Sequence, residues 1–182
     1  MNNTSKNGQA KAIALPKVNP AIRVLKAALF TALVALVWVL TTSSVWASGN
    51  LIVGSWVTPD DKAVVEIYEQ GGLYYGKFTS LKEPTYTAGH ADGLDGQPKT
   101  DRNNPDASQH AELIIGLVML NGLKYAGEKK GQHQWKGGSI YDPGNGKTYK
   151  STIKLNADGT LDMRGYIGIS LFGRTQVWRP FQ

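Results

Sequence analysis

Apolar and polar residues alternate along short segments of this chain, and this pattern constrains the fold more than any other sequence feature. In residues 147–155, for example, Tyr149, Ser151, Ile153 and Leu155 fall on one side, and threonines and lysines fall on the other. A period of two gives each strand one dry face and one wet face, which is typical of antiparallel sheets. The pattern therefore predicts an all-β domain.

Eight segments, each rich in β-branched and aromatic residues, are predicted to be strands. They are residues 51–58, 63–70, 73–81, 113–120, 134–141, 147–155, 160–167 and 172–179. Turn-forming residues separate several of them, and residues 121–131 fit either a short turn or an extra strand. About eight strands at hairpin spacing indicate an up-and-down barrel or a sandwich. We expect a single antiparallel up-and-down β-barrel, because closure removes exposed strand edges.

The first 47 residues differ in composition from the rest of the chain. Residues 1–26 contain five basic residues and no acidic one, and an apolar stretch follows at 27–40. Small residues then precede a cleavage site after Ala47, so we expect a cleaved signal peptide over residues 1–47. We expect the remaining residues, 48–182, to form a single exported domain, periplasmic or secreted. An uncleaved membrane anchor is the alternative, although polar residues 41–44 interrupt the apolar stretch before the roughly 20 residues that a span needs.

The basic character of the whole chain comes from its first 47 residues. All 14 acidic residues follow residue 47, whereas five of the 20 Lys and Arg residues precede it, so the mature domain carries a net charge of about +1. This balance gives no support for binding of nucleic acid or of an anionic membrane. We also expect no stable membrane span after cleavage. The chain has no cysteine, which excludes disulfides, thiolate metal ligands and a bacterial lipid anchor.

The motifs of common enzymes are incomplete in this sequence. Residues 168–173 have one residue too many for Gly-x-Ser-x-Gly. Tyr141 occupies the place of the first glycine that a phosphate-binding loop ending at residues 146–148 requires. The three histidines are His90, His110 and His133, and their spacing is not that of a metal site. We therefore expect no catalytic residue, no metal and no cofactor.

The polar connection over residues 83–112 is the longest expected loop. Asp92, Asp95, Asp101 and Asp106 offer oxygen ligands for Ca²⁺, but their spacing is not that of an EF-hand loop. A connection of this length inside a small domain is usually functional or mobile. A hydrolase that takes its acid and base from this loop, with Asp101 and Asp106 as the residues to replace, is therefore an alternative function.

Inward-facing apolar and aromatic side chains are the candidates for a ligand site. We expect Tyr74, Phe78, Tyr149, Ile153 and Met163 to line the interior, with Trp135 or Tyr141 near a mouth. An eight-stranded barrel is just wide enough to be packed solid or to hold one small ligand. The alternative is therefore that these residues simply fill the barrel. The unusually apolar connection 167–172 is expected to plug the barrel, to form a lid or to touch the envelope membrane.

Residues at the two ends of the mature domain resemble those of the lipocalin and fatty-acid-binding barrel group. Gly54-Ser55-Trp56 lies on the first predicted strand, and Arg174, Trp178 and Arg179 lie on the last. In that group a first-strand Trp closes the barrel base and a last-strand Arg stacks over it, which combines a cation–π contact with burial of a large ring. The resemblance implies a barrel-closing role for these Trp and Arg residues.

A wider resemblance covers essentially all of the mature domain. Its motifs are, in order, Val65-Glu66-Ile67-Tyr68, Tyr75-Gly76-Lys77, Asn104-Pro105-Asp106, Ile115-Gly116-Leu117, Trp135-Lys136-Gly137-Gly138, Ile140-Tyr141-Asp142-Pro143, Asn145-Gly146-Lys147-Thr148-Tyr149 and Gly173-Arg174-Thr175-Gln176-Val177-Trp178. They are similar to those of a bacterial family of exported proteins catalogued as domain-of-unknown-function family 2147. The resemblance implies a lipocalin-like barrel in the periplasm or outside the cell. It does not imply any established reaction. It does imply a role in binding a small, largely apolar molecule.

Three functions are compatible with these observations. The favoured one is non-catalytic binding of a small hydrophobic or amphipathic molecule, because the strands have dry faces and the catalytic motifs are incomplete. The first alternative is an envelope structural or assembly factor that docks to an envelope protein through residues 167–172 or an open strand edge. The second is the hydrolase that uses acids of the long loop.

Overall fold

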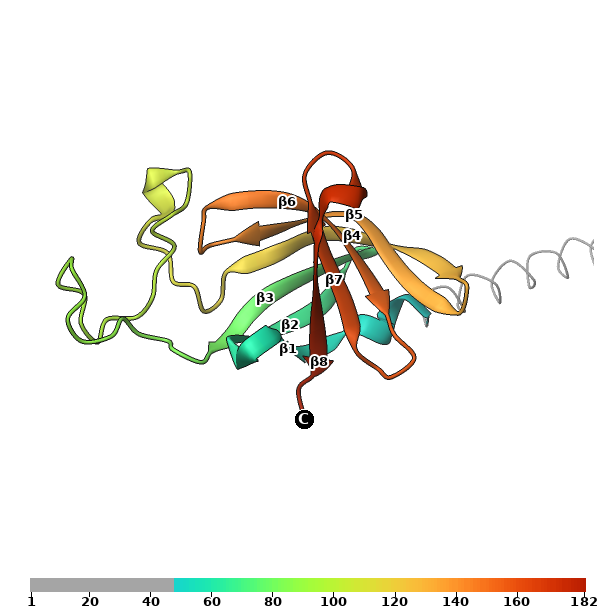
Figure 1. The fold of residues 1–182 in the computed structure, drawn as a ribbon, viewed down its shortest axis with the longest axis horizontal. Helices are drawn as coiled ribbons and strands as arrows, with labels where there is room; N and C mark the ends of the chain where they lie inside the picture. Colours follow the sequence, from blue (N-terminus) through green and yellow to red (C-terminus); the bar gives the residue numbers. More distant parts are fainter. Residues whose placement is uncertain (1–47) are drawn as a thin grey trace, which may run out of the picture. The chain divides into compact units, whose positions relative to one another are not determined.

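Eight antiparallel strands close into one barrel in the structure, a computed structural model that describes residues 48–182 (Figure 1). The strands are β1 Gly54–Val57, β2 Ala63–Gln70, β3 Leu73–Leu81, β4 Val118–Lys129, β5 Gln132–Asp142, β6 Lys147–Leu155, β7 Leu161–Tyr166 and β8 Arg174–Pro180. Each strand pairs with the next along the chain. The first and last strands close the ring, with Trp56 opposite Pro180 and Val57 opposite Arg179. The predicted up-and-down barrel is confirmed.

The alternating sequence pattern sets which side chains face the interior. On β6, Ser151 and Ile153 are fully buried, and on β7 Leu161 and Met163 are buried to the same degree. The residues between them carry hydroxyl or charged groups and are less buried. The dry face and the wet face predicted from the sequence are therefore the inner and outer faces of the barrel.

Helical structure within residues 50–182 is limited to four single turns. They are the 3₁₀ helices η1 Asn50–Ile52, η2 Pro59–Asp61, η3 Ala107–Gln109 and η4 Ser170–Phe172. No helix in this part of the chain has the length and apolar character needed to cross a membrane. The predicted signal peptide, residues 1–47, lies outside the described residues, so export and cleavage stay predictions.

The position predicted for the fourth strand was wrong. The prediction placed it at residues 113–120, whereas β4 covers Val118–Lys129 and includes most of the segment left open as a turn or an extra strand. Gly122 and Gly127 on β4 adopt positive φ angles of 68° and 84°, and the pairing register with β5 shifts between Tyr125 and Glu128. Glycines weaken a strand signal, but at irregular positions they supply the backbone geometry of a bulge.

The end of the barrel at which β1 begins, here called the packed end, is filled by side chains and covered by residues 49–52. Trp135 donates from Nε1 to the carbonyl of Gly49 at 3.0 Å, and Trp56 donates from Nε1 to the carbonyl of Ile52 at 2.8 Å. The Tyr74 hydroxyl donates to Oδ1 of Asn50 at 3.1 Å. Each large ring therefore has a partner for its polar atom, which removes the main cost of burying it.

The opposite end, here called the open end, carries the connections 82–117, 143–146 and 167–173. Figure 1 shows the β3–β4 connection extending beyond the barrel on the same side as the β5–β6 turn. Asn103 joins the two, because its Nδ2 donates to the carbonyls of Pro143 at 2.9 Å and Gly144 at 3.1 Å. The long loop is thus attached to the rim of the barrel.

Candidate functional site

Two cavities occupy the open end of the barrel. The larger, here called the loop cavity, has a volume of about 950 Å³ and lies between the β3–β4 connection and the rim. The smaller, here called the strand cavity, has a volume of about 490 Å³ and is lined by β5, β6, β7 and β8. Both volumes fall in the range of small-molecule sites. Asp142 and Gln176 line both cavities.

The strand cavity has an apolar and aromatic wall. Ile140, Tyr149 and Met163 contribute to it from three strands, and Phe172 contributes from the β7–β8 connection. Gly165 provides part of the space, because a Cβ atom there would lie 3.4 Å from Cγ2 of Ile140 and 3.6 Å from Cβ of Tyr149. The missing side chain at this inward position of β7 therefore enlarges the cavity.

Arg174 gives the strand cavity a positive charge. It lies at the start of β8, opposite Gly165 of β7, and its side chain is exposed to solvent. No ion pair among residues 48–182 includes it. Ser151 on β6 also lies opposite Gly165, and within residues 48–182 its hydroxyl is the buried side-chain polar atom that has no hydrogen-bond partner.

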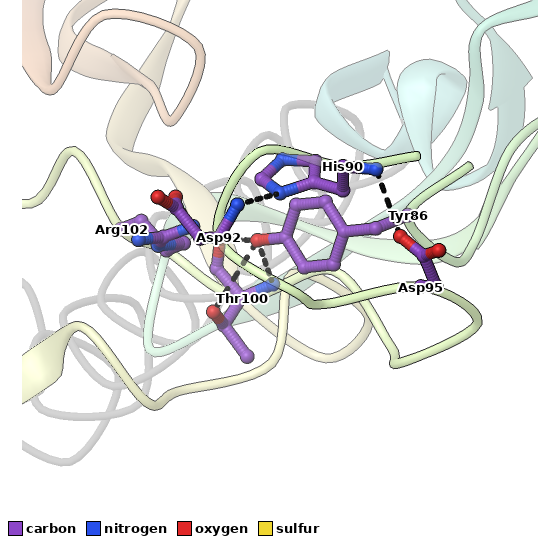
Figure 2. Close-up of polar contacts among 6 residues, drawn as sticks. All are labelled: Tyr86, His90, Asp92, Asp95, Thr100 and Arg102. Atoms are coloured by element: carbon purple, nitrogen blue, oxygen red, sulfur yellow. Dashed lines mark hydrogen bonds and ion pairs between the residues drawn. The ribbon is translucent and has the colours of Figure 1, made fainter. Parts of the chain in front are cut away.

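The loop cavity contains a network of polar side chains, drawn in Figure 2. The rings of Tyr86 and His90 pack edge to face with centroids 4.7 Å apart. The Tyr86 hydroxyl accepts from the backbone N–H of Thr100 at 3.2 Å, and the His90 ring accepts through Nδ1 from the N–H of Asp92 at 3.3 Å. Arg102 pairs with Asp92 at 2.6 Å. The network folds the long loop onto itself.

The cationic side chains that line the loop cavity have partners within the protein. Lys82 has no carboxylate partner, but its Nζ donates to the carbonyl of Asp60 at 3.3 Å. Lys99 pairs with Glu83 at 3.3 Å, and Lys62 pairs with Asp60 at 3.4 Å. Asp95, beside the cavity, accepts from the backbone N–H groups of Gly89 and His90, and these bonds lower the pKa of its carboxyl. Because these bonds stabilise the ionised form, Asp95 holds its turn with a fixed negative charge.

A buried carboxylate fixes the second half of the long loop. Asp101 is fully buried, and its two oxygens accept from the Tyr141 hydroxyl and from Nδ2 of Asn104, each at 2.7 Å. Its backbone N–H donates to the carbonyl of Glu112. Burial, followed by the hydrogen bond and charge of Asp101, raises the pKa of Tyr141 to about 12. Asp101 therefore joins the loop to β5 as a structural acceptor.

The other candidate chemical groups of the long loop lie in separate structural contacts. Asp106 accepts from the backbone and side chain of Ser108 at the start of η3, and these bonds lower its pKa. Nε2 of His110 contacts the carbonyl of Asn104 at 2.8 Å, and Nδ1 of His133 contacts the Tyr125 hydroxyl at 2.7 Å. No group of three or more His, Asp or Glu side chains within residues 48–182 is arranged to hold a metal ion.

The side chains predicted to line a ligand site divide between the two ends of the barrel. Tyr141, Tyr149 and Met163 line the strand cavity, and Phe78 lines the loop cavity. Tyr74, Trp135 and Ile153 lie in the core and line neither cavity. The role of the first group as ligand contacts stays a prediction, whereas the second group fills the barrel.

The residues predicted to close the barrel are also separated. Trp56 and Trp178 are buried in the core. Arg179 pairs with Asp61 at 2.6 Å, on a partly exposed surface, and Arg174 lies at the open end. The expected stacking of an Arg over Trp56 is not found; the cation–π contact among the described residues joins Lys77 to Tyr68. The guanidinium of Arg179 is held by Asp61 instead.

Sequence reasoning did not assign Gly165 or Gln176 to the site, and it gave Arg174 a barrel-closing role instead of a place in the strand cavity. The signal was present in β8, because residues 174, 176 and 178 fall on one face of a strand and Trp178 is a large apolar residue of the kind that faces an interior. Applying the alternation from Trp178 backwards would have placed Arg174 and Gln176 on the interior side. The alternation on β7 also places Gly165 on the inner face, with Leu161 and Met163, but only the packing around it shows that it leaves space.

Comparisons with known proteins agree with this architecture. The sequence model of a bacterial family, described as "Uncharacterized protein conserved in bacteria (DUF2147)", matches residues 54–179. A solved structure, protein HP1028 from the human pathogen Helicobacter pylori, is described as belonging to the lipocalin family. It is 25% identical in sequence, with a TM-score of 0.58, and the match covers 72% of this chain and 83% of that one. The search of curated proteins found no match.

Proposed function

We propose that this chain, which belongs to the bacterial family DUF2147, is an exported, non-catalytic protein that binds a small amphipathic molecule in the strand cavity. The observation that carries the proposal is the cavity itself, which opens at one end of a closed barrel whose other end is packed. Its aromatic and aliphatic wall offers apolar contact, and its rim offers polar groups, which is the usual composition of a small-molecule site.

The strand cavity is a better ligand site than the larger loop cavity. In the loop cavity, Lys62, Lys99 and Arg102 each pair with a carboxylate, and Lys82 donates to the carbonyl of Asp60. An anionic ligand there would therefore compete with an existing carboxylate or carbonyl partner. The strand cavity contains Arg174 without such a pair, next to apolar side chains. It can accept both parts of an amphipathic molecule without displacing an internal contact.

Binding without catalysis fits the chemistry of the acidic residues better than hydrolysis does. Asp101 is fully buried and holds Tyr141 and Asn104, and Asp106 caps η3. Each carboxylate is thus assigned to a structural contact. The lipocalin family to which HP1028 is assigned by its description, together with the signal sequence expected at residues 1–47, supports a binding protein that acts outside the cytoplasm.

Filling the strand cavity tests this proposal. In Gly165→Leu the new side chain occupies the space beside Ile140 and Tyr149, and the backbone conformation at this position suits any residue. The control is Thr152→Leu, which adds the same side chain to the outer face of the neighbouring strand β6. Binding of an anilinonaphthalene sulfonate dye to the full-length protein should weaken about tenfold or more in Gly165→Leu, a change of about 1.4 kcal/mol, and should be unchanged in the control. Equal binding by both variants would contradict the proposal.

The exposed β7–β8 connection favours a second candidate function. Ile167, Ile169, Leu171 and Phe172 are 61–79% exposed. A contiguous exposed apolar segment is often an interaction site, so docking to an envelope protein through residues 167–172 is the alternative. Crosslinking in cells from a photoreactive residue at position 171 tests it. A defined protein adduct supports docking, and an absence of adducts counts against it.

A further inference from the structure

We infer that the ligand of the strand cavity carries an anionic head group, a carboxylate or a phosphate, which binds to Arg174 beside Gln176 and Tyr149. This inference rests on the proposed function, because it names the chemical class of the molecule that the same cavity binds. It follows from a count of the hydrogen-bond donors and acceptors that remain unused at the rim. Four polar side chains decide it.

Among residues 48–182, Arg174 supplies the only unpaired guanidinium at this rim. The other three Arg residues in this range have partners, including Arg102, which pairs with Asp92. Arg164 donates to the carbonyls of Ser170 and Leu171 and to the Thr175 hydroxyl, and Arg179 pairs with Asp61. The planar guanidinium of Arg174 can donate two parallel bonds to the oxygens of a carboxylate or phosphate.

Gln176 and Tyr149 also present donors. Oε1 of Gln176 accepts from Nε1 of Trp178 at 3.2 Å, which assigns the amide so that its NH₂ group is left for another partner. The oxygen of the Tyr149 hydroxyl accepts from Nδ2 of Asn145 at 3.1 Å, so its own proton is not used in that bond. Both residues line the strand cavity. The hydrogen-bonding groups that both side chains still have unused are donors, and these match an acceptor group on the ligand.

Asp142, the acidic residue that lines the strand cavity, uses its carboxylate for hydrogen bonds within the β5–β6 turn. Oδ1 of Asp142 accepts from the N–H of Gly144 at 2.9 Å, and Oδ2 accepts from Nδ2 of Asn145 at 2.8 Å. Asp142 lies opposite Lys147 in the strand pairing, which places a cation beside it. No ion pair within residues 48–182 joins Asp142 to Arg174. The carboxylate therefore stabilises the β5–β6 turn and leaves the positive charge of Arg174 to a ligand.

The apolar part of the ligand lies deeper in the strand cavity than the head group. Met163 is almost fully buried at the base of the cavity, and the space beside Gly165 leads toward it. A molecule whose tail enters between Tyr149 and Met163 places its head group at the start of β8, where Arg174 lies. Burial of the tail supplies a hydrophobic contribution of about 0.8 kcal/mol for each CH₂ group removed from water. The head group then decides selectivity between ligands with the same tail.

Titration with probes that share one tail tests the inference. Decanoate, decanol and decyltrimethylammonium, each below its micelle concentration, are titrated calorimetrically into the full-length protein. A hydrogen-bonded charge pair at a solvent-exposed rim should favour decanoate about tenfold over decanol, and decyltrimethylammonium should bind most weakly. Decyl phosphate in a fourth titration separates a phosphate from a carboxylate as the preferred head group. Tighter binding of either anion supports the inference.

Two charge-matched variants identify the anchor. Arg174→Gln should reduce the affinity for decanoate about tenfold, to the level of decanol, while decanol binding stays unchanged. Arg179→Gln removes the same charge from the same strand outside the cavity and should leave both affinities unchanged. If all probes bind equally while Gly165→Leu still weakens binding of the dye, the inference of an anionic head group is overturned but the proposed function is not. Binding of no probe, together with unaltered dye binding in Gly165→Leu, would overturn both.

Discussion

The packed end and the open end of the barrel are built from the same eight strands but differ in what their side chains do. At the packed end, Trp135, Ile153 and Leu161 are fully buried, and residues 49–52 lie across them with hydrogen bonds to the aromatic rings. At the open end, large apolar side chains of residues 167–172 are exposed, and two cavities remain. The densely packed core and the proposed ligand site therefore lie at opposite ends of one interior.

The connections explain this difference. At the packed end, tight turns join β2 to β3 and β4 to β5, so the strands meet closely. At the open end, the β3–β4 connection spans residues 82–117 and is held to the rim by Asn103 and Asp101. The long connection lies over the rim of the barrel, and the loop cavity is the space between the connection and the rim. The predictions below compare the two ends, beginning with the largest expected effect.

Trp135→Ala should destabilise the protein most. The substitution removes a fully buried indole and its hydrogen bond to Gly49, and large-to-small changes of this kind cost about 3–5 kcal/mol. Urea unfolding followed by circular dichroism measures the loss. Tyr149→Ala, on the inner face at the open end, is the comparison and should cost much less. A similar loss in both variants would contradict the division between the two ends.

Asp101→Ala should have the next largest effect. It removes the acceptor of the Tyr141 hydroxyl and the Asn104 amide. Leaving such groups without a partner costs about 1–3 kcal/mol. We expect the β3–β4 connection to loosen while the barrel remains, so limited proteolysis should cut within residues 82–117 before any strand is lost. Unchanged proteolysis of that connection would contradict the role of Asp101 as its attachment.

Tyr141→Phe should change the dependence of stability on pH. The pKa of Tyr141 is raised from 10.0 to about 12 in the folded protein, so folding favours the neutral phenol. This stabilisation is present in full below pH 10 and is lost as the pH rises toward 12. The difference in unfolding free energy between wild type and Tyr141→Phe should therefore narrow across that interval. A constant difference would show that Tyr141 titrates normally.

Phe172→Ala should have the smallest effect on stability. Its ring is 79% exposed, and surface substitutions away from special contacts usually change stability by no more than about 0.5 kcal/mol. Thermal unfolding measures this, with Phe78→Ala as a buried aromatic control. A loss comparable to that of the control would mean that the ring packs against the protein in solution, and that the open end is less open than described.

The sequence predicted the architecture well because the strand signal is repeated. The alternation on β6 and β7, the hairpin turns and the order of the strands are local features, and the structure confirms them. The fourth strand was displaced because Gly122 and Gly127 interrupt its pattern, although they fit its irregular pairing with β5. Local composition does not reveal where a neighbouring strand accepts a bulge.

The candidate site was harder to predict, because it depends on contacts between distant residues. Asp101 meets Tyr141 across 40 positions of the sequence, and Asp61 meets Arg179 across 118. Neither spacing carries a signal in a single sequence. The aromatic residues of the interior could be chosen from their pattern, but which of them fill the packed end depends on how residues 49–52 fold over them.

The most direct test of the division between the two ends is a nuclear magnetic resonance titration of the protein with decanoate. Saturating decanoate should shift the signals of Tyr149, Gly165 and Arg174 and leave the Trp135 indole N–H and Ile153 unchanged. Shifts that are largest at Trp135 and Ile153, or an absence of shifts at Gly165 and Arg174, would contradict a ligand site at the open end.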